Sequence, residues 1–242
     1  SISFSAGGFQ AKYGDKLSSV LDIKYREPKD FHGSVSGNLM GASAHIEGSS
    51  KGYRLRYLIG ARQRSNSYLL NSLDVEGDYN TSFTDVQSYI TYDLSHQWEL
   101  GWFSYFGRNK YNLVPQTQVT DYGTSDLVLR FKVFFDGQET TAYQNFLNAL
   151  NLTYKNGDSL KIKFIASAYT TKETEYFDEE GQYWLDQVDT DPGSETFDSS
   201  KYNIGVGTFL NHARNTLYAD IANFQKKRKK IFQNSDLRWG VK

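Results

Sequence analysis

The chain has 242 residues, with 27 Lys and Arg against 28 Asp and Glu, no Cys and a formal net charge of −1. These values exclude a disulfide scaffold and give no global electrostatic reason to expect nucleic acid as a partner. The 18 Tyr, 16 Phe and 4 Trp are too many rings for a disordered chain, and no apolar run approaches the about 20 residues of a membrane-spanning helix.

Alternation of apolar and polar residues with a period of two is the main pattern along the chain. Between residues 53 and 62, most apolar side chains fall on odd positions, whereas Arg54, Arg56 and Arg62 fall on even positions. This pattern is typical of β-strands with one apolar and one polar face. It predicts an all-β, antiparallel chain with about nine strands. In chain order, they are expected around residues 35–39, 42–46, 53–62, 86–94, 98–102, 146–154, 160–169, 217–221 and 234–242.

The connections between these strands fall into short and long classes. Tight turns are expected at Ser49–Gly52, Ser95–Gln97 and Asn156–Asp158, the last of which contains an Asn-Gly pair typical of a hairpin. Short turns at one end and long loops at the other are typical of outer-membrane barrels, and loops of such length are uncommon in soluble barrels. The long, polar, Gly- and Pro-containing loops are expected at about residues 65–83, 110–143 and 176–207.

Aromatic residues near the short turns fit the same interpretation. Tyr53, Tyr92, Trp98 and Tyr154 lie next to the turns on the apolar face of their strands, where a membrane barrel has an interfacial girdle. The alternative is the general preference of aromatic residues for strands. Strict alternation further predicts a set of lipid-facing side chains, namely Leu55, Ile59, Val86, Ile90, Leu100, Leu160, Ile162 and Phe164.

The N-terminal region resembles a known motif. Residues 6–14 (AGGFQAKYG) and 17–26 (LSSVLDIKYR) are similar to the end of the plug domain in TonB-dependent outer-membrane receptors. Further stretches resemble the branch of that family with an N-terminal carboxypeptidase-like regulatory domain: 41–48, 82–87, 181–185 and 205–214. The resemblance implies that residues 1–30 end a plug domain. Residues 31–242 then form the N-terminal part of a transmembrane β-barrel, with about nine of roughly 22 strands.

The same resemblance implies a function without covalent chemistry. The complete receptor imports a nutrient of unassigned class (siderophore, glycan or peptide) through a plugged barrel in the bacterial outer membrane. The implied partners are TonB, through a segment preceding this one, the remainder of the barrel in the same or another chain, outer-membrane lipid and a surface lipoprotein. Neither an enzymatic activity nor a cofactor is expected.

Two groups of residues are candidates for this function. If the apolar strand face meets lipid, Arg54, Arg56 and Arg62 point into the lumen, because an arginine facing mid-bilayer lipid costs about 2 to 4 kcal/mol. There they are expected to pair with plug carboxylates. Tyr183 and Trp184 lie beside several acidic residues in an expected loop, and their rings suit a stacked substrate.

Other charged groups favour structural roles. His32, His45, His96 and His212 have no ligand or triad spacing, so no metal site is expected. The acidic residues between 178 and 191 fit either a solvated loop or, less well, calcium, since their spacing is not that of an EF-hand. The run Lys226–Lys230 is expected in a solvated periplasmic turn, with contact to lipid phosphates as the alternative.

A soluble β-sandwich that binds a ligand or carbohydrate is the alternative to the membrane barrel. It also explains the aromatic residues and the loops. It requires two sheets whose apolar faces are packed against each other, so the two architectures differ in what covers the apolar face.

Overall fold

The computed structural model describes residues 1–9, 13, 18–72, 77–232 and 235–241, and most of these residues belong to β-strands. No helix in this part of the chain is long and apolar enough to span a membrane. The elements in order are β1 (Ile2–Ala6), β2 (Ser19–Ile23), β3 (His32–Asn38), β4 (Gly41–Ser49), β5 (Leu55–Arg64), α1 (Ser67–Leu70), β6 (Gly77–Asp93), β7 (Trp98–Pro115), β8 (Gln118–Thr124), β9 (Leu127–Asn156), β10 (Leu160–Val188), β11 (Ser200–Ile231) and β12 (Asp236–Val241).

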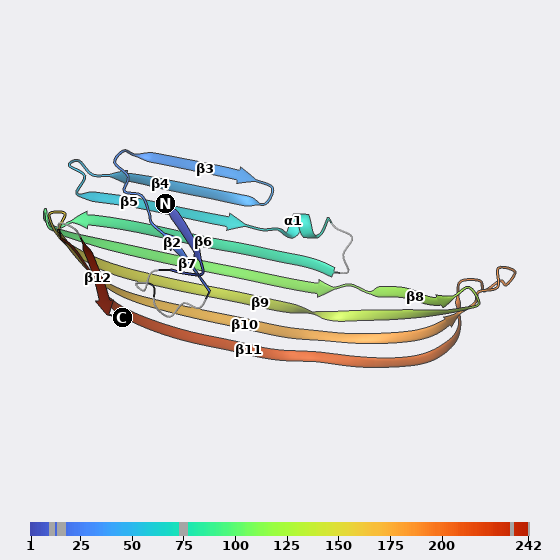
Figure 1. Cartoon of the computed structure of the whole chain (residues 1–242). Coiled ribbons are helices and arrows are strands. Elements are labelled where there is room, and N and C mark those ends of the chain that lie inside the picture. The colour runs from blue at the N-terminus through green and yellow to red at the C-terminus, as the bar shows by residue number, and fades with distance from the viewer. Residues whose placement is uncertain (10–12, 14–17, 73–76, 233–234, 242) are drawn as a thin grey trace.

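One large antiparallel sheet contains every strand from β3 onward. Its order is β12-β11-β10-β9-β7-β6-β5-β4-β3, so neighbours in space are neighbours in sequence apart from β8, which pairs with β9. The short strand β8 continues along β9 beyond the end of β7. β1 and β2 form a separate two-stranded sheet. Figure 1 shows the large sheet as a single curved layer from which β9, β10 and β11 extend far beyond the other strands.

The strand register divides the large sheet into two faces, because directly opposed residues of an antiparallel pair share a face. We define the inner face as the one that carries Tyr89 and Phe103, on which Tyr25 packs. The opposite, outer face carries all eight side chains predicted to share one apolar face. One row across it consists of Leu55, Tyr92, Leu100, Leu152 and Phe164.

Burial on the two faces is the reverse of that in a soluble protein. Thr91 and Thr153 of the inner face are only 2% and 1% exposed, whereas Leu150 and Phe224 of the outer face are 52% and 65% exposed. None of the eight predicted lipid-facing side chains is buried. The described residues form no second sheet over the outer face, so the stacked layers of a β-sandwich are not formed there.

Two of the three long loops expected from the sequence are largely strands, and for these two the prediction was wrong, whereas of the described residues in 65–83 only 77–83 belong to a strand, β6. Most of 110–143 belongs to β7, β8 and β9, and most of 176–207 belongs to β10 and β11. β9 and β10 stay in register without interruption from the Asn156–Leu160 end to the Val128–Val188 end. Even Gly137, expected in a long loop, lies within β9 with a φ of +103°, and a Cβ added there would collide with the backbone of Asp178. Continuous backbone pairing therefore outweighs the polar, Gly-containing composition of these stretches.

The basic run Lys226–Lys230 also differs from expectation. It belongs to β11 and pairs with both β10 and β12, so it is not a turn. Because side chains alternate along a strand, the run is divided between the two faces. Lys227 and Lys229 lie on the inner face, and Lys226, Arg228 and Lys230 lie on the outer face.

The turn between β10 and β11, residues 189–199, is organised around Asp189. Its carboxylate accepts hydrogen bonds from Thr196 Oγ1 at 2.7 Å and the Asp191 amide at 3.2 Å. Hydrogen bonds from Thr196 and Ser194 lower the pKa of Asp189 to about 2. A lowered pKa stabilises the folded turn fully above the unfolded value of about 4, and this contribution disappears as the pH falls through 2.

We therefore expect the turn to resist pepsin at pH 4 and to be cleaved near the exposed Phe197 at pH 2. Thr196→Val removes the strongest hydrogen bond to Asp189 and is expected to move the onset of cleavage to higher pH. Equal cleavage of the parent at both pH values, after correction for the pH dependence of pepsin, contradicts a role for ionised Asp189.

Candidate functional site

The segment between β2 and β3 lies on the inner face of the large sheet. The Tyr25 ring stacks on Tyr89 with centroids 5.3 Å apart and lies 5.6 Å from Phe103. Its hydroxyl donates a hydrogen bond of 2.8 Å to Gln87 Oε1. Ring stacking and a satisfied hydroxyl together attach this segment to β6 and β7.

A buried carboxylate continues this attachment on β4. Glu47 is only 3% exposed, and its two oxygens lie 2.6 and 2.7 Å from Arg26 nitrogens. His45 Nε2 approaches it at 3.2 Å. The burial of a carboxylate requires such partners, and hence Arg26 connects the N-terminal segment to the wall of the sheet.

Arg56 is the centre of a charged network at the short-turn end. Its guanidinium makes two hydrogen bonds of 2.9 Å to the Asp93 carboxylate and lies 3.4 Å from Glu99 and 3.8 Å from Glu27. The Arg56 side chain is 11% exposed. Lys155 Nζ donates to the same Glu99 at 2.9 Å. Three carboxylates and two bases therefore meet where the N-terminal segment passes the strand ends.

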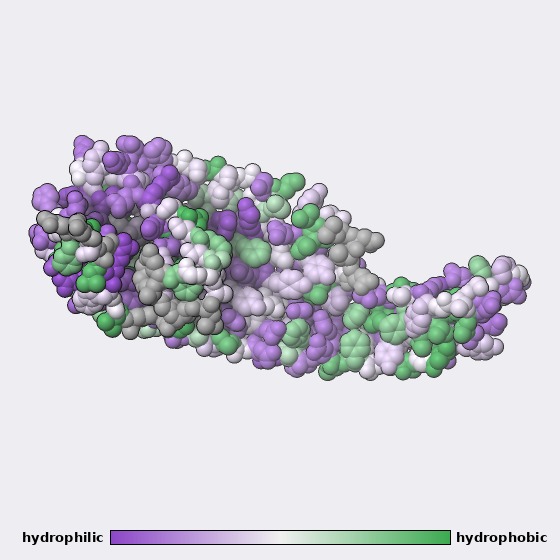
Figure 2. Space-filling view, in the orientation of Figure 1, coloured by the Kyte–Doolittle hydropathy of each residue, from purple (hydrophilic) through white to green (hydrophobic). Residues whose placement is uncertain are grey.

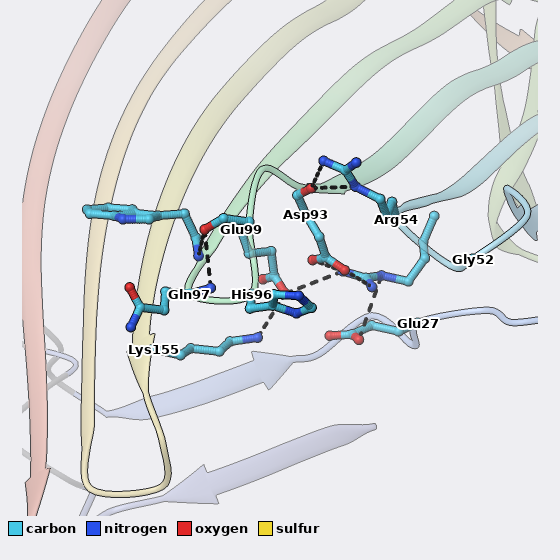
Figure 3. Close-up of a pocket in the computed structure, with 11 residues that line it drawn as sticks. Glu27, Gly52, Arg54, Asp93, His96, Gln97, Glu99 and Lys155 are labelled. Carbon is cyan, nitrogen blue, oxygen red and sulfur yellow. Dashed lines mark hydrogen bonds and ion pairs between the residues drawn. The ribbon is translucent and has the colours of Figure 1, made fainter.

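A pocket of about 530 Å³ opens beside this network. Figure 3 shows Glu27 on one side of it, Asp93 and Glu99 on the other, and Lys155 reaching in from β9. His96 and Gln97 of the turn between β6 and β7 complete the lining. Its charged walls suit a polar chain segment better than an apolar ligand.

The structure brings together only part of the predicted arginine group. Arg56 lies on the inner face and contacts Glu27, a carboxylate of the predicted plug region, at 3.8 Å. Arg62 lies on the same face, because it is an even number of residues from Arg56 along β5. It pairs with Asp85 of β6 at 2.7 Å. Arg54 precedes β5 and donates to the backbone carbonyls of Asp93 and Leu94. Of the three, Arg56 alone has an ion pair with a described residue of the N-terminal segment.

Tyr183 and Trp184 lie on the part of β9, β10 and β11 that extends beyond the other strands, which we call the distal extension. They point to opposite faces, since they are successive residues of β10. Tyr183 packs on the inner face 5.8 Å from Phe131, and Trp184 packs on the outer face 4.9 Å from Phe134. They cannot line one site together. Tyr183 belongs instead to an inner aromatic group with Phe131, Phe135 and Phe209.

Glycines make room for the rings of this inner aromatic group. The Tyr183 ring covers Gly207, and the Phe209 ring covers Gly181, where an added Cβ would lie 2.3 and 2.2 Å from ring atoms. Figure 2 shows hydrophobic residues gathering on this extension, whereas hydrophilic residues dominate the opposite end of the sheet. Tyr183 remains a predicted substrate contact in this group.

The acidic residues of this region are divided between a strand and a turn: Asp178, Glu179, Glu180 and Asp186 belong to β10, whereas Asp189 and Asp191 belong to the turn after it. Asp178 of β10 faces His212, with 2.7 Å between Oδ1 and Nδ1, and also pairs with Arg214. Both bases hold the pKa of Asp178 below its usual value. Within the described ranges, no three His, Cys, Asp or Glu side chains are placed to hold a metal ion.

Sequence reasoning missed Tyr25, Arg26, Glu47 and the carboxylate partners of Arg56. Their partners are separated by 21 to 62 residues along the chain, and no short motif connects them. No family model, curated protein or solved structure matches this chain.

Proposed function

We propose that the chain is part of the barrel wall of a TonB-dependent outer-membrane importer, with the end of its plug held on the inner face. The observation that carries this proposal is the reversed burial of the large sheet. Apolar outer side chains are exposed and polar inner side chains are buried. Exposing so much apolar surface to water is unfavourable, whereas hydrocarbon accommodates it.

The dimensions of the apolar band support a bilayer. On β7 the outer face is apolar from Trp98 to Phe106, apart from Ser104, which is about 26 Å along a strand and about 20 Å in height after a tilt of about 40°. The next outward residue, Arg108, is charged. Two polar groups in the rows of this band are paired: Asn148 Oδ1 accepts a hydrogen bond from Trp102 Nε1 at 3.2 Å, and Asp220 Oδ1 accepts one from Thr170 Oγ1 at 2.6 Å.

Aromatic residues mark one border of this band. Trp98 and Tyr154 are opposed across β7 and β9, with ring centroids 4.9 Å apart, and Trp239 lies in the same row on β12. Tryptophan and tyrosine are enriched where a barrel meets the headgroups. The short turns next to this row correspond to the periplasmic side.

The edges of the sheet support a larger assembly. β3 and β12 are its first and last strands, and every residue of β3 is exposed. Unpaired backbone groups in hydrocarbon cost several kcal/mol each. We infer that the remaining strands of the barrel, from the same or another chain, pair with these edges. The contacts of Tyr25, Arg26 and Glu27 then connect plug and wall, and TonB acts on the plug through a preceding segment.

Depth-dependent fluorescence quenching tests this function. All four tryptophans, Trp98, Trp102, Trp184 and Trp239, lie on the outer face. The full polypeptide is reconstituted in vesicles as single-tryptophan versions, with phosphatidylcholines brominated at known depths. We expect Trp102 to be quenched best by deep bromines and Trp98 by shallow bromines, whereas Trp184, far along the extension, escapes quenching.

Circular dichroism of each version verifies that the β-structure is retained. If none of the folded versions is quenched, the outer face meets water or protein, and the importer proposal fails. A soluble binding module is then the remaining interpretation.

A further inference from the structure

The outer face carries a group of three bases at its short-turn border. Lys226, Arg228 and Lys230 alternate along β11 and therefore point to the same side. They lie next to the aromatic row, since Arg228 is opposed to Ile162 on one side and Trp239 on the other. We name Lys226, Arg228 and Lys230 the outer basic cluster.

Aromatic rings, not carboxylates, surround the outer basic cluster. Lys226 Nζ lies 5.7 Å from the ring centres of both Phe164 and Trp239, Arg228 Cζ lies 5.8 Å from that of Trp239, and Lys230 Nζ lies 4.8 Å from that of Phe232. No ion pair joins the cluster to an acidic side chain that the structure describes, a set that excludes the Asp236 side chain.

Arg228 also has an unused donor. Its Nε has no hydrogen-bond partner, and guanidinium groups suit phosphate oxygens geometrically. Because this Nε is buried, a phosphate outside the sheet is reached through the terminal nitrogens of the guanidinium. Cation–π contacts position the charges but leave their N–H donors unsatisfied. The cluster thus presents three cationic groups, spread over about 13 Å of β11, to the medium that contacts the outer face.

We propose that the outer basic cluster binds the phosphate of an anionic phospholipid headgroup. This inference rests on the proposed function, which puts the outer face in lipid. A base within the hydrocarbon is strongly unfavourable. Arg228 shares the row of Trp98, Tyr154 and Trp239, which marks headgroup height, and Lys230 lies two residues farther from the apolar band. Lys226 lies two residues nearer to the band, but its Nζ is 5.7 Å from the Trp239 ring centre. At headgroup height the available anions are lipid phosphates. Trp239 covers the acyl side of the site, and the three bases hold the headgroup.

The test compares two headgroups at one tryptophan. The full polypeptide with Trp98, Trp102 and Trp184 replaced by phenylalanine retains Trp239 as its fluorophore. It is reconstituted in vesicles that contain equal amounts of phosphatidylglycerol and phosphatidylcholine, with bromine on only one of the two lipids. Each base near an anionic surface contributes about fivefold in association. We expect brominated phosphatidylglycerol to quench Trp239 as strongly as if the local ratio of phosphatidylglycerol to phosphatidylcholine were at least about five.

Two double variants each remove two positive charges, one variant from the outer face and the other from the inner face. Lys226→Gln with Arg228→Gln leaves only Lys230 of the cluster and is expected to lower the enrichment strongly, whereas Lys161→Gln with Lys227→Gln, on the inner face, is expected to retain it. High salt should weaken the enrichment in the parent. Equal quenching by both lipids in the parent overturns the headgroup site but leaves the membrane placement intact. An absence of quenching by either lipid overturns the membrane placement itself.

Discussion

Replacing Leu150 by arginine is expected to destabilise the protein in lipid by about 2 to 4 kcal/mol. Leu150 lies on the outer face near the middle of the apolar band, opposed to Trp102 and Ala166, and is 52% exposed. In water, arginine at so exposed a position changes the free energy of unfolding by no more than about 0.5 kcal/mol. In hydrocarbon, the guanidinium loses its hydration. Urea titration of the protein in vesicles measures the difference.

Leu210→Arg is the matched control. Leu210 also lies on the outer face, opposed to Glu180, and is 72% exposed, but it belongs to the distal extension. We expect this variant to retain the parent free energy of unfolding within about 0.5 kcal/mol. If both variants are equally stable, the outer face is not immersed in lipid, and its apolar residues require another cover.

The strands near the short turns were predictable because each has one face that differs chemically from the other. Leu55 to Ala61 and Leu160 to Ala168 alternate clearly, and their register follows from the short turns. The shared face of the eight predicted apolar residues is confirmed. Their contact with lipid stays a prediction.

The distal strands were not predictable in the same way. In β10, residues 176–182 are polar or glycine at most positions on both faces, so alternation gives no signal there. Their strand conformation depends on pairing with β9 and β11 over a distance of many residues. Residues 127–135 of β9 do alternate, with Leu127, Leu129, Phe131, Val133 and Phe135 on one face, but they fall within the long loop expected at 110–143, which also contains Asp136 and Gly137.

The partners of Arg56 in the site were likewise not predictable from local sequence patterns. The inward direction of Arg56 follows from alternation alone, whereas its partners come from β6, β7 and the segment before β3. Such a meeting depends on sheet register and on the path of the N-terminal segment. The positions of charged residues along the sequence give neither the register nor this path.

Replacing Arg56 by methionine is expected to lower the free energy of unfolding by roughly 2 to 4 kcal/mol. Removing one partner of a buried ion pair typically costs about 3 to 5 kcal/mol, and the cost here is smaller because the 34% and 59% exposed side chains of Asp93 and Glu27 reach water. The variant leaves Asp93 and Glu99 close together with Lys155 as the nearest remaining base. Urea titration in vesicles measures the loss, and protease sensitivity of residues 24–31 reports release of the N-terminal segment.

Two comparisons give this prediction its specificity. Arg62→Met removes an arginine from the same strand and face, but its side chain is 50% exposed and pairs with Asp85 alone, so a loss of no more than about 1 kcal/mol is expected. Arg56→Lys retains the charge but not the forked donors that hold both Asp93 oxygens, and we expect it to restore only part of the stability. If Arg56→Met releases the segment no more than Arg62→Met does, the Glu27 contact does not connect plug and wall, and the attachment depends on Tyr25 and Arg26 instead.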